Sequence, residues 1–355
     1  MKNDSFARSF ASIAALLGLS FSIHTQAKEN TPVYGAELEG FDYAYPVRTF
    51  DFASQGKNVH MAYLDVPPTR PAASNGRTVV LMHGKLFCAD TWRATIKVLT
   101  ENGFRVIAPD QIGFCKSTKP DAYQYSFQQL ASNTHRLLQS LHIKKYTVIG
   151  HSMGGMLATR FALMYPESVE QLALINPLGL EDWKALGVPY VTIDEIYQEE
   201  RKTSAEDMKD YQRAVHYGGE WRPEFDRWIT MQAGMYNGPG GQQVARSAAL
   251  THDMIFNQPV VYEFDKLTVP TVLFVGLKDK TAFTNHASAD VVARLANYAV
   301  LGKTAAARIP QSTLVEFADL AHSPHLQDPE RFHRSLLIAL GVMQESSRGI
   351  EKVAR

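Results

Sequence analysis

The chain has 355 residues, of which 45% are hydrophobic and 20% charged, a balance that suits a folded domain with a large core. Lysine plus arginine and aspartate plus glutamate number 36 each, and no stretch concentrates positive charge. The composition therefore excludes disorder and does not predict nucleic-acid binding. At this length we expect one large α/β unit with an insertion.

Residues 1–27 have the pattern of a secretory signal peptide. Lys2 and Arg8 precede an apolar run over 10–23, and a small-residue cleavage site ends at Ala27. An uncleaved anchor is the weaker alternative, because the run is shorter and less apolar than the roughly 20 residues that a spanning helix needs. We predict a periplasmic or secreted protein with no stable membrane insertion after cleavage.

Strand and helix patterns alternate through the next part of the chain. Two strand-like runs within 47–66 flank the turn Ser54-Gln55-Gly56 and indicate a hairpin. Short Val/Ile/Leu-rich runs then alternate with helices predicted over 90–102, 127–141 and 153–165. This order predicts a mostly parallel sheet with helices on both faces.

The alternation stops near Pro177 and resumes at the strand 270–276. The interval has helical periodicity, and we interpret 178–262 as a helical cap between two parts of the core, 28–177 and 263–345. Candidate cap helices cover 193–203, 205–215, 223–233 and 242–256. Beyond the strand 270–276 we predict a helix over 285–297, the strand TLVEFA and a helix over 329–340.

The most specific motif is Gly150-His151-Ser152-Met153-Gly154, which directly follows a predicted strand and precedes an amphipathic helix. A G-x-S-x-G motif in this context is typical of a nucleophile elbow. Its glycines permit a turn too tight for larger side chains, which exposes the serine oxygen beside the positive end of the helix. We predict Ser152 as the nucleophile.

A serine nucleophile needs a histidine base and an acid that orients the base. Asp279 follows the strand 270–276 and His322 follows the strand TLVEFA, which gives the chain order Ser, acid, His of the nucleophile-elbow fold. Asp265 and Asp290 are poorer candidates because neither follows a strand. His325 is a close rival of His322 that spacing alone does not exclude.

An oxyanion hole needs two backbone amides that point at the developing negative charge. Met153 is predicted to supply one, and the loop after the strand TVVLMHG the other, at Lys85 or at Leu86. The Lys85 side chain has two open interpretations: solvated, or a cation that favours substrates with a negative group.

Taken together, these motifs resemble the α/β-hydrolase superfamily in spacing and order. The resemblance implies an eight-stranded, mostly parallel sheet flanked by helices, a helical cap inserted after the sixth strand, and a triad of Ser152, Asp279 and His322. A serine in this place excludes the branches that use an aspartate nucleophile. The residues that carry the resemblance are His83-Gly84, Asp110-x-x-Gly113-x-x-x-Ser117, Gly150 to Gly155, Gly276-x-x-Asp279 and His322-x-Pro324.

Two cysteines, Cys88 and Cys115, lie on loops that leave neighbouring predicted strands. A disulfide and a pair of buried free thiols both remain possible, because the outcome depends on their Cα separation. No histidine pair or C-x-x-C motif has metal-ligand spacing, and no glycine-rich phosphate loop is present, so we expect neither a metal nor a cofactor.

The leading hypothesis is an exported serine hydrolase that cleaves a carboxylic ester or similar acyl bond of a small molecule through an acyl-enzyme on Ser152. One alternative is carbon–carbon bond hydrolysis of the ring-cleavage-product type, suggested weakly by the segment 176–180. Another is a non-catalytic ligand-binding protein on the same fold. Five cap residues are candidates for the pocket wall or for the core of the cap: Tyr190, Trp221, Trp228, Met231 and Tyr236.

Overall fold

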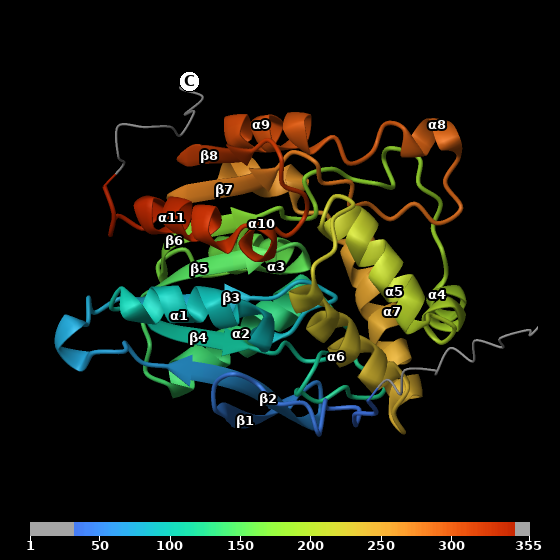
Figure 1. Cartoon of the computed structure of the whole chain (residues 1–355), viewed down its shortest axis with the longest axis horizontal. Helices are drawn as coiled ribbons and strands as arrows, with labels where there is room; N and C mark the ends of the chain where they lie inside the picture. Colours follow the sequence, from blue (N-terminus) through green and yellow to red (C-terminus); the bar gives the residue numbers. More distant parts are fainter. Residues whose placement is uncertain (1–31, 345–355) are drawn as a thin grey trace, which may run out of the picture. The chain divides into compact units, whose positions relative to one another are not determined.

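An eight-stranded sheet forms the centre of the protein, for which the computed structural model describes residues 32–344 (Figure 1). The strand order is β1-β2-β4-β3-β5-β6-β7-β8; β2 runs antiparallel to β1 and β4, and the remaining pairs are parallel. The predicted leader at 1–27 lies outside the described residues. The strands are β1 (Val47–Ser54), β2 (Lys57–Val66), β3 (Thr78–Met82), β4 (Arg105–Pro109), β5 (Tyr146–His151), β6 (Val169–Ile175), β7 (Thr271–Gly276) and β8 (Ser312–Phe317).

Burial explains why the central strands have continuous apolar sequences. Every residue of β3, β5 and β7 is buried, because helices cover both faces of the sheet. At the edge, β1 exposes most of its residues and pairs with β2 as the predicted hairpin. Gln55 and Gly56 make its turn with φ of 49° and 72°.

Two helical layers enclose the sheet. On one face α1 (Arg93–Glu101) and α11 (Pro329–Ala339) bury their apolar side chains in a cluster with residues of β2 to β8. The opposite face is covered by α2 (Phe127–Ser140), α3 (Met153–Met164) and α9 (Tyr298–Arg308). The predicted mostly parallel sheet flanked by helices is therefore confirmed.

Four helices occupy the chain between β6 and β7 and gather at one end of the strands, beside the sheet (Figure 1). They are α4 (Ile193–Glu200), α5 (Ala205–Tyr211), α6 (Asp226–Tyr236) and α7 (Gly241–Asn257). α4 and α5 each begin with a capping box, in which the side chain of Thr192 or Ser204 accepts a hydrogen bond from the backbone amide three residues later. A five-residue π-helix, Gln212–His216, continues α5. We refer to α4–α7 and their connections as the cap.

One predicted helix is wrong. In place of a helix over 285–297, the structure has only the short α8 (Ala289–Val292), and the next long helix is α9. Within 285–297 only Leu295 and Ala296 are buried, and Val292 is 41% exposed, so most of the segment does not pack on the core. α9 instead packs directly on β7 at Gly302, where an added Cβ would lie 3.1 Å from the Val275 side chain. Another short helix, α10 (Pro324–Gln327), precedes α11.

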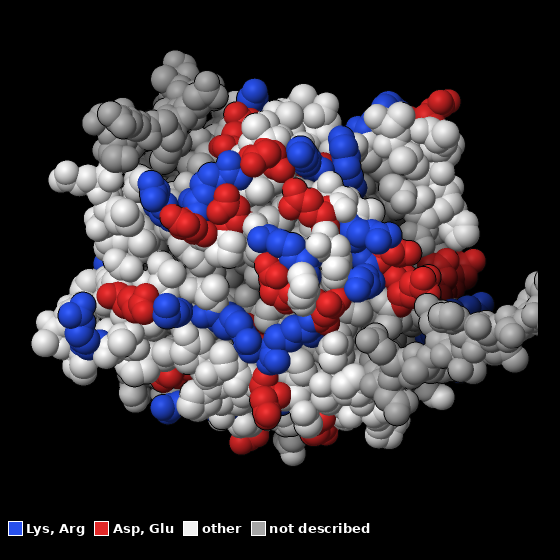
Figure 2. All heavy atoms as spheres, in the orientation of Figure 1, with Lys and Arg blue, Asp and Glu red and all other residues white. Residues whose placement is uncertain are grey.

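The surface matches the balanced composition. On the face shown in Figure 2, basic and acidic side chains lie beside one another without a patch of one sign. None of the helices within residues 32–344 combines the length and apolarity needed to cross a membrane.

Candidate active site

Ser152 lies in a strained turn between β5 and α3. Its φ of 57° and ψ of −123° are unusual for a residue with a side chain. Hydrogen bonds hold the turn: the Ser152 amide donates to the Ile175 carbonyl at 3.1 Å, and the Leu178 amide donates to the Ser152 carbonyl at 3.1 Å. The backbone of β6 and of the loop after it thus fixes the serine at the C-terminal end of β5.

The glycines around Ser152 are required by crowding. A Cβ added at Gly150 would lie 2.1 Å from the Gly154 carbonyl oxygen, and one at Gly154 would lie 2.1 Å from the Met82 carbonyl oxygen. None of these backbone atoms can rotate away as a side chain would. The motif therefore lets α3 approach β3 and β5 closely enough to form the turn.

His322 and Asp279 form a buried pair. The His322 Nδ1 lies 2.7 Å from the Asp279 Oδ2, and both side chains are almost fully buried. The same carboxylate oxygen accepts from Asn176 Nδ2 at 2.9 Å, and Oδ1 accepts from the Thr281 amide at 2.8 Å. These donors fix the carboxylate, which in turn fixes the imidazole so that its Nε2 points away from Asp279.

Ser152 and His322 line one cavity, with Asp279 behind the histidine. Within the described residues, Ser152 Oγ makes no hydrogen bond to His322. Catalytic serine–histidine contacts are often long before a substrate binds. The structure therefore brings Asp279 and His322 into contact and places Ser152 in the same cavity wall without a hydrogen bond to the histidine.

The rival residues lie elsewhere. His325 is buried and stacks on Trp92 at 4.8 Å between ring centres, outside the cavity wall. Asp265 lies 3.9 Å from Arg308, and Asp290 lies on α8. Among these candidates, Asp279 and His322 are the pair that makes direct contact.

A turn after β3 approaches the serine. The Phe87 amide donates to the Gly84 carbonyl at 3.1 Å, so Lys85 and Leu86 are the central turn residues. A Cβ at Gly84 would lie 3.1 Å from the Ser152 Cβ. We call residues 84–87 the oxyanion turn, after the role predicted from the sequence for Lys85 or Leu86.

Three amides beside Ser152 remain available to a ligand. Those of Lys85, Leu86 and Met153 donate to no other residue within 32–344. Met153 is the first residue of α3, where an amide has no intrahelical acceptor. Free donors on both sides of a serine are what an oxyanion hole requires.

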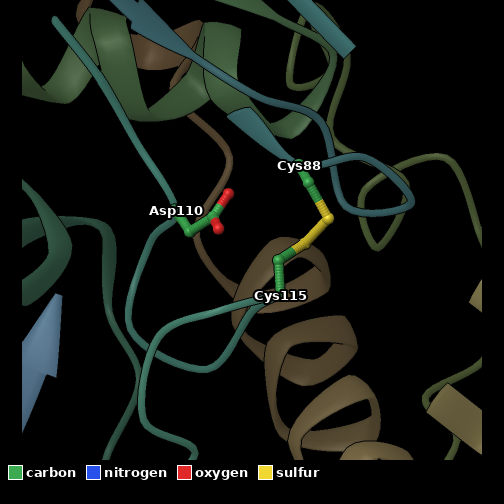
Figure 3. Close-up of side chains that lie close together, drawn as sticks. All are labelled: Cys88, Asp110 and Cys115. Carbon is green, nitrogen blue, oxygen red and sulfur yellow. A yellow bond between two sulfur atoms is a disulfide. The ribbon is translucent and has the colours of Figure 1, made fainter. Parts of the chain in front are cut away.

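A disulfide joins Cys88, next to the oxyanion turn, to Cys115 on the loop after β4 (Figure 3). Their Cα atoms are 5.8 Å apart, within the usual range for this bond. Asp110 lies beside it and accepts from the Ala89 amide at 2.7 Å and the Lys116 amide at 3.1 Å. The three side chains are close enough to suggest a metal site, but the bonded sulfurs offer no thiolate.

The cavity has a volume of about 430 Å³ and is enclosed by the core and the cap. Of the five cap residues considered above, Tyr236 lines it, Met231 lines only a smaller neighbouring pocket of about 50 Å³, and Trp228 is buried in the core. Tyr190 and Trp221 lie in neither wall. Sequence reasoning missed other wall residues, which follow no motif: Phe87, Tyr211, His216, His252 and Phe283.

The Lys85 ammonium is paired rather than solvated or free. Its Nζ lies 2.7 Å from Glu200 Oε1 on α4, and the side chains of both residues are largely buried. The other Glu200 oxygen accepts from the Tyr236 hydroxyl at 2.5 Å. The cavity therefore presents a neutralised pair where the sequence suggested a possible cation.

Three further buried histidines surround His322. The ring centres of His151 and His216 lie 4.8 and 4.7 Å from that of His322, and His325 lies 4.6 Å from His151. Burial, followed by repulsion from neighbouring histidines, holds the pKa values of His151, His216 and His325 well below the usual 6.5. These three rings are therefore neutral at pH 7.

Residues 77–329 match the family described as the alpha/beta hydrolase fold. The chain also resembles the crystal structure of a probable hydrolytic enzyme from Pseudomonas aeruginosa PAO1, with 63% identity and a TM-score of 0.86 over 87% of this chain and 99% of that one. The protein belongs to the α/β-hydrolase family. Hydrolysis of a small-molecule substrate is the activity that this membership implies.

Curated relatives match a shorter stretch. An uncharacterised protein from Mycobacterium tuberculosis is 37% identical over 108 residues, which is 30% of this chain and 31% of that protein. The 2-hydroxy-6-oxo-2,4-heptadienoate hydrolase from Pseudomonas putida is 31% identical over 108 residues, 30% of this chain and 39% of that enzyme. The match thus spans about a third of the length of these curated relatives.

Proposed function

We propose that the protein is a serine hydrolase that cleaves a carboxylic ester or a similar acyl bond. The observation that carries the proposal is the cavity itself: its lining includes Ser152 on a strained turn, His322 bonded to Asp279 behind it, and Lys85 and Leu86 with unpaired amides. Acyl transfer requires a nucleophile, an oriented base and donors for an oxyanion, and these features correspond to the three.

The proposed reaction assigns each of these groups a step. His322 Nε2 takes the proton of Ser152 Oγ, which attacks the substrate carbonyl. The amides of Met153 and of Lys85 or Leu86 bind the oxyanion of the tetrahedral intermediate. Its collapse breaks the bond to the alcohol oxygen, which receives the proton from His322. Water, deprotonated by His322, then attacks the acyl-enzyme and releases the acid and the free serine.

A second candidate is carbon–carbon bond hydrolysis, suggested by the likeness to the Pseudomonas putida enzyme. The substrate in that enzyme's name, a heptadienoate, carries a carboxylate. Lys85, the cation in the cavity wall, is already paired with Glu200. The ester hypothesis needs no anion site and is therefore preferred.

The test is hydrolysis of p-nitrophenyl acetate, butyrate and octanoate by the wild type, Ser152→Ala and Ser140→Ala. Ser140 is an exposed serine on α2 and serves as the matched control. We expect turnover by the wild type and the control, with a preference among chain lengths, and loss in Ser152→Ala. A phosphonate probe should add its mass to Ser152. A folded wild type that turns over no ester would refute the proposal.

We further propose that the protein is exported and that residues 1–27 are removed. The proposal rests on the basic start, apolar run and small-residue site of the leader. The mature protein recovered from expressing bacteria should begin at Lys28 by intact mass. An unprocessed chain in the cytosolic fraction would contradict it.

A further inference from the structure

His216 is a cap residue that reaches the catalytic wall. It ends the π-helix Gln212–His216, lines the cavity and is only 4% exposed. Its ring centre lies 4.7 Å from that of His322 and 5.4 Å from that of Phe87 in the oxyanion turn. The ring is therefore held between the proposed base and the proposed oxyanion hole.

The backbone of His216 fixes this position. The Ser323 amide donates to the His216 carbonyl at 3.2 Å, so the cap is tied to the residue after His322. π-Helical turns occur frequently at functional sites. The link joins the backbone at His216 to the backbone next to His322.

The nitrogen atoms of His216 have no protein partner. Nδ1 is buried without a hydrogen bond, whereas Nε2 is not among the buried unpaired atoms and bonds no other residue within 32–344. Other buried histidines are satisfied: His151 contacts the His322 carbonyl at 2.9 Å, and His333 contacts Thr95 at 3.0 Å. His325 also has an unpartnered Nδ1, but it does not line the cavity. Because His216 lines the cavity and its Nε2 has no protein partner, this nitrogen is available to a ligand.

The electrostatic surroundings make this contact neutral. Burial, then His322 and His325, keep the pKa of His216 well below 6.5, so the ring offers one donor and one acceptor without a charge. Tyr211 and Tyr217 are the other titratable side chains whose rings contact it. Burial keeps the pKa of each tyrosine far above 7, so both are also neutral.

The position of His216 relative to the reaction identifies the part of the substrate that it meets. In the proposed reaction the alcohol oxygen receives its proton from His322, so the alcohol half must lie against that ring. We propose that His216 hydrogen bonds a hydroxyl or ether oxygen on the alcohol half, and that the enzyme prefers uncharged esters with such an oxygen close to the ester bond. This inference rests on the proposed esterase function.

The test compares two butyrate esters of nearly equal size, 2-hydroxyethyl butyrate and propyl butyrate. We expect the wild type to favour the hydroxyethyl ester in kcat/KM by about fivefold, the effect of one hydrogen bond. His216→Phe, which keeps a ring but removes both nitrogens, should reduce the ratio to about one. His216→Gln places its amide near the Nε2 position and should retain part of the preference, whereas His216→Asn, which mimics Nδ1, should not.

His135→Phe is the matched control, because this half-buried histidine stacks on Tyr165 outside the cavity. It should leave the ratio unchanged. Equal ratios in the wild type and His216→Phe would overturn the inference while leaving the esterase function intact, and so would a ratio unaffected by His216→Gln and His216→Asn.

Binding separates the inference from the proposed function. If the folded wild type cleaves neither ester, the esterase proposal fails, and calorimetric Kd values of both esters for Ser152→Ala then decide the role of His216. If Ser152→Ala binds the hydroxyethyl ester more tightly than the propyl ester, and the double variant Ser152→Ala/His216→Phe does not, the proposed contact is supported. Equal Kd values would overturn it.

Discussion

The two walls of the cavity are built differently. The core wall combines side chains such as His322 and Phe87 with a fixed backbone: a serine with positive φ, glycines with no room for a Cβ, and free amides. The cap wall is made of side chains, among them Glu200, His216 and Tyr236. The tight backbone of the core wall tolerates few substitutions, whereas the side chains of the cap wall can be exchanged without altering the fold. The core wall therefore suits the chemistry, and the cap wall suits the choice of substrate.

Asp279→Asn should have the largest effect. The amide would bond His322 in the wrong tautomer, and kcat should fall about 10⁴-fold with the fold intact. The measurement is kcat for p-nitrophenyl butyrate, with circular dichroism to check folding. Asp290→Asn on the exposed α8 is the control and should keep full activity. A loss below tenfold in Asp279→Asn would remove this residue from the mechanism.

Gly154→Ala and Gly219→Ala compare the same substitution in the two regions. At Gly154 the new Cβ would meet the Met82 carbonyl oxygen at 2.1 Å, so we expect a loss of about 3 kcal/mol or more in the free energy of unfolding. At Gly219 in the cap nothing lies within 4 Å, and only the φ of 94° opposes alanine, at about 1 kcal/mol. Urea denaturation measures both. Equal losses would contradict the difference between the walls.

Acid should destabilise the protein through its buried histidines. The folded-state pKa values of His151, His216 and His325 lie well below 6.5, so between these values and pH 6.5 the unfolded chain binds more protons. The stability that the neutral buried histidines contribute is complete above pH 6.5. It is lost as pH falls below 6.5, by up to about 1.4 kcal/mol per pH unit for each histidine. Burial also lowers the pKa of His252 to about 3 and that of His333 to about 4.

Urea denaturation between pH 7.5 and 5.5 tests this dependence. The unfolding free energy should depend less steeply on pH in His216→Phe, because this variant lacks one histidine that takes up a proton on unfolding. His135→Phe, in the half-buried stack with Tyr165, should change the slope less. A wild-type stability that is constant from pH 7.5 to 5.5 would contradict the prediction.

Glu200→Gln should have the smallest effect. It leaves the Lys85 cation unpaired but retains an oxygen for the Tyr236 hydroxyl. We expect the kcat/KM ratio for monoethyl succinate over ethyl butyrate to rise about fivefold, the effect of a partly buried charge. Asp194→Asn on the same helix, where the carboxylate is 88% exposed and pairs with Arg246, is the control. An unchanged ratio would show that Lys85 does not face the substrate.

The sequence determined the features that depend on local backbone geometry and periodicity. The apolar runs of β3, β5 and β7 predicted the sheet, because strands buried on both faces have no polar alternation. The family was recognisable from the spacing of its motifs, because a tight strand-to-helix turn needs glycine at fixed positions. The roles of Ser152, Asp279 and His322 remain predictions from this pattern.

Only the tertiary structure decided what depends on contacts between distant segments. The disulfide could be assigned only once the Cα separation of Cys88 and Cys115 was known. The neutralisation of the Lys85 charge became visible only from its distance to Glu200. His216 became part of the site because the cap folds over His322. The helix predicted over 285–297 was wrong: the structure has only α8 there, and the long helix α9 that packs on β7 begins at Tyr298. Such contacts leave no period in the sequence, since the partners are chosen by packing in three dimensions.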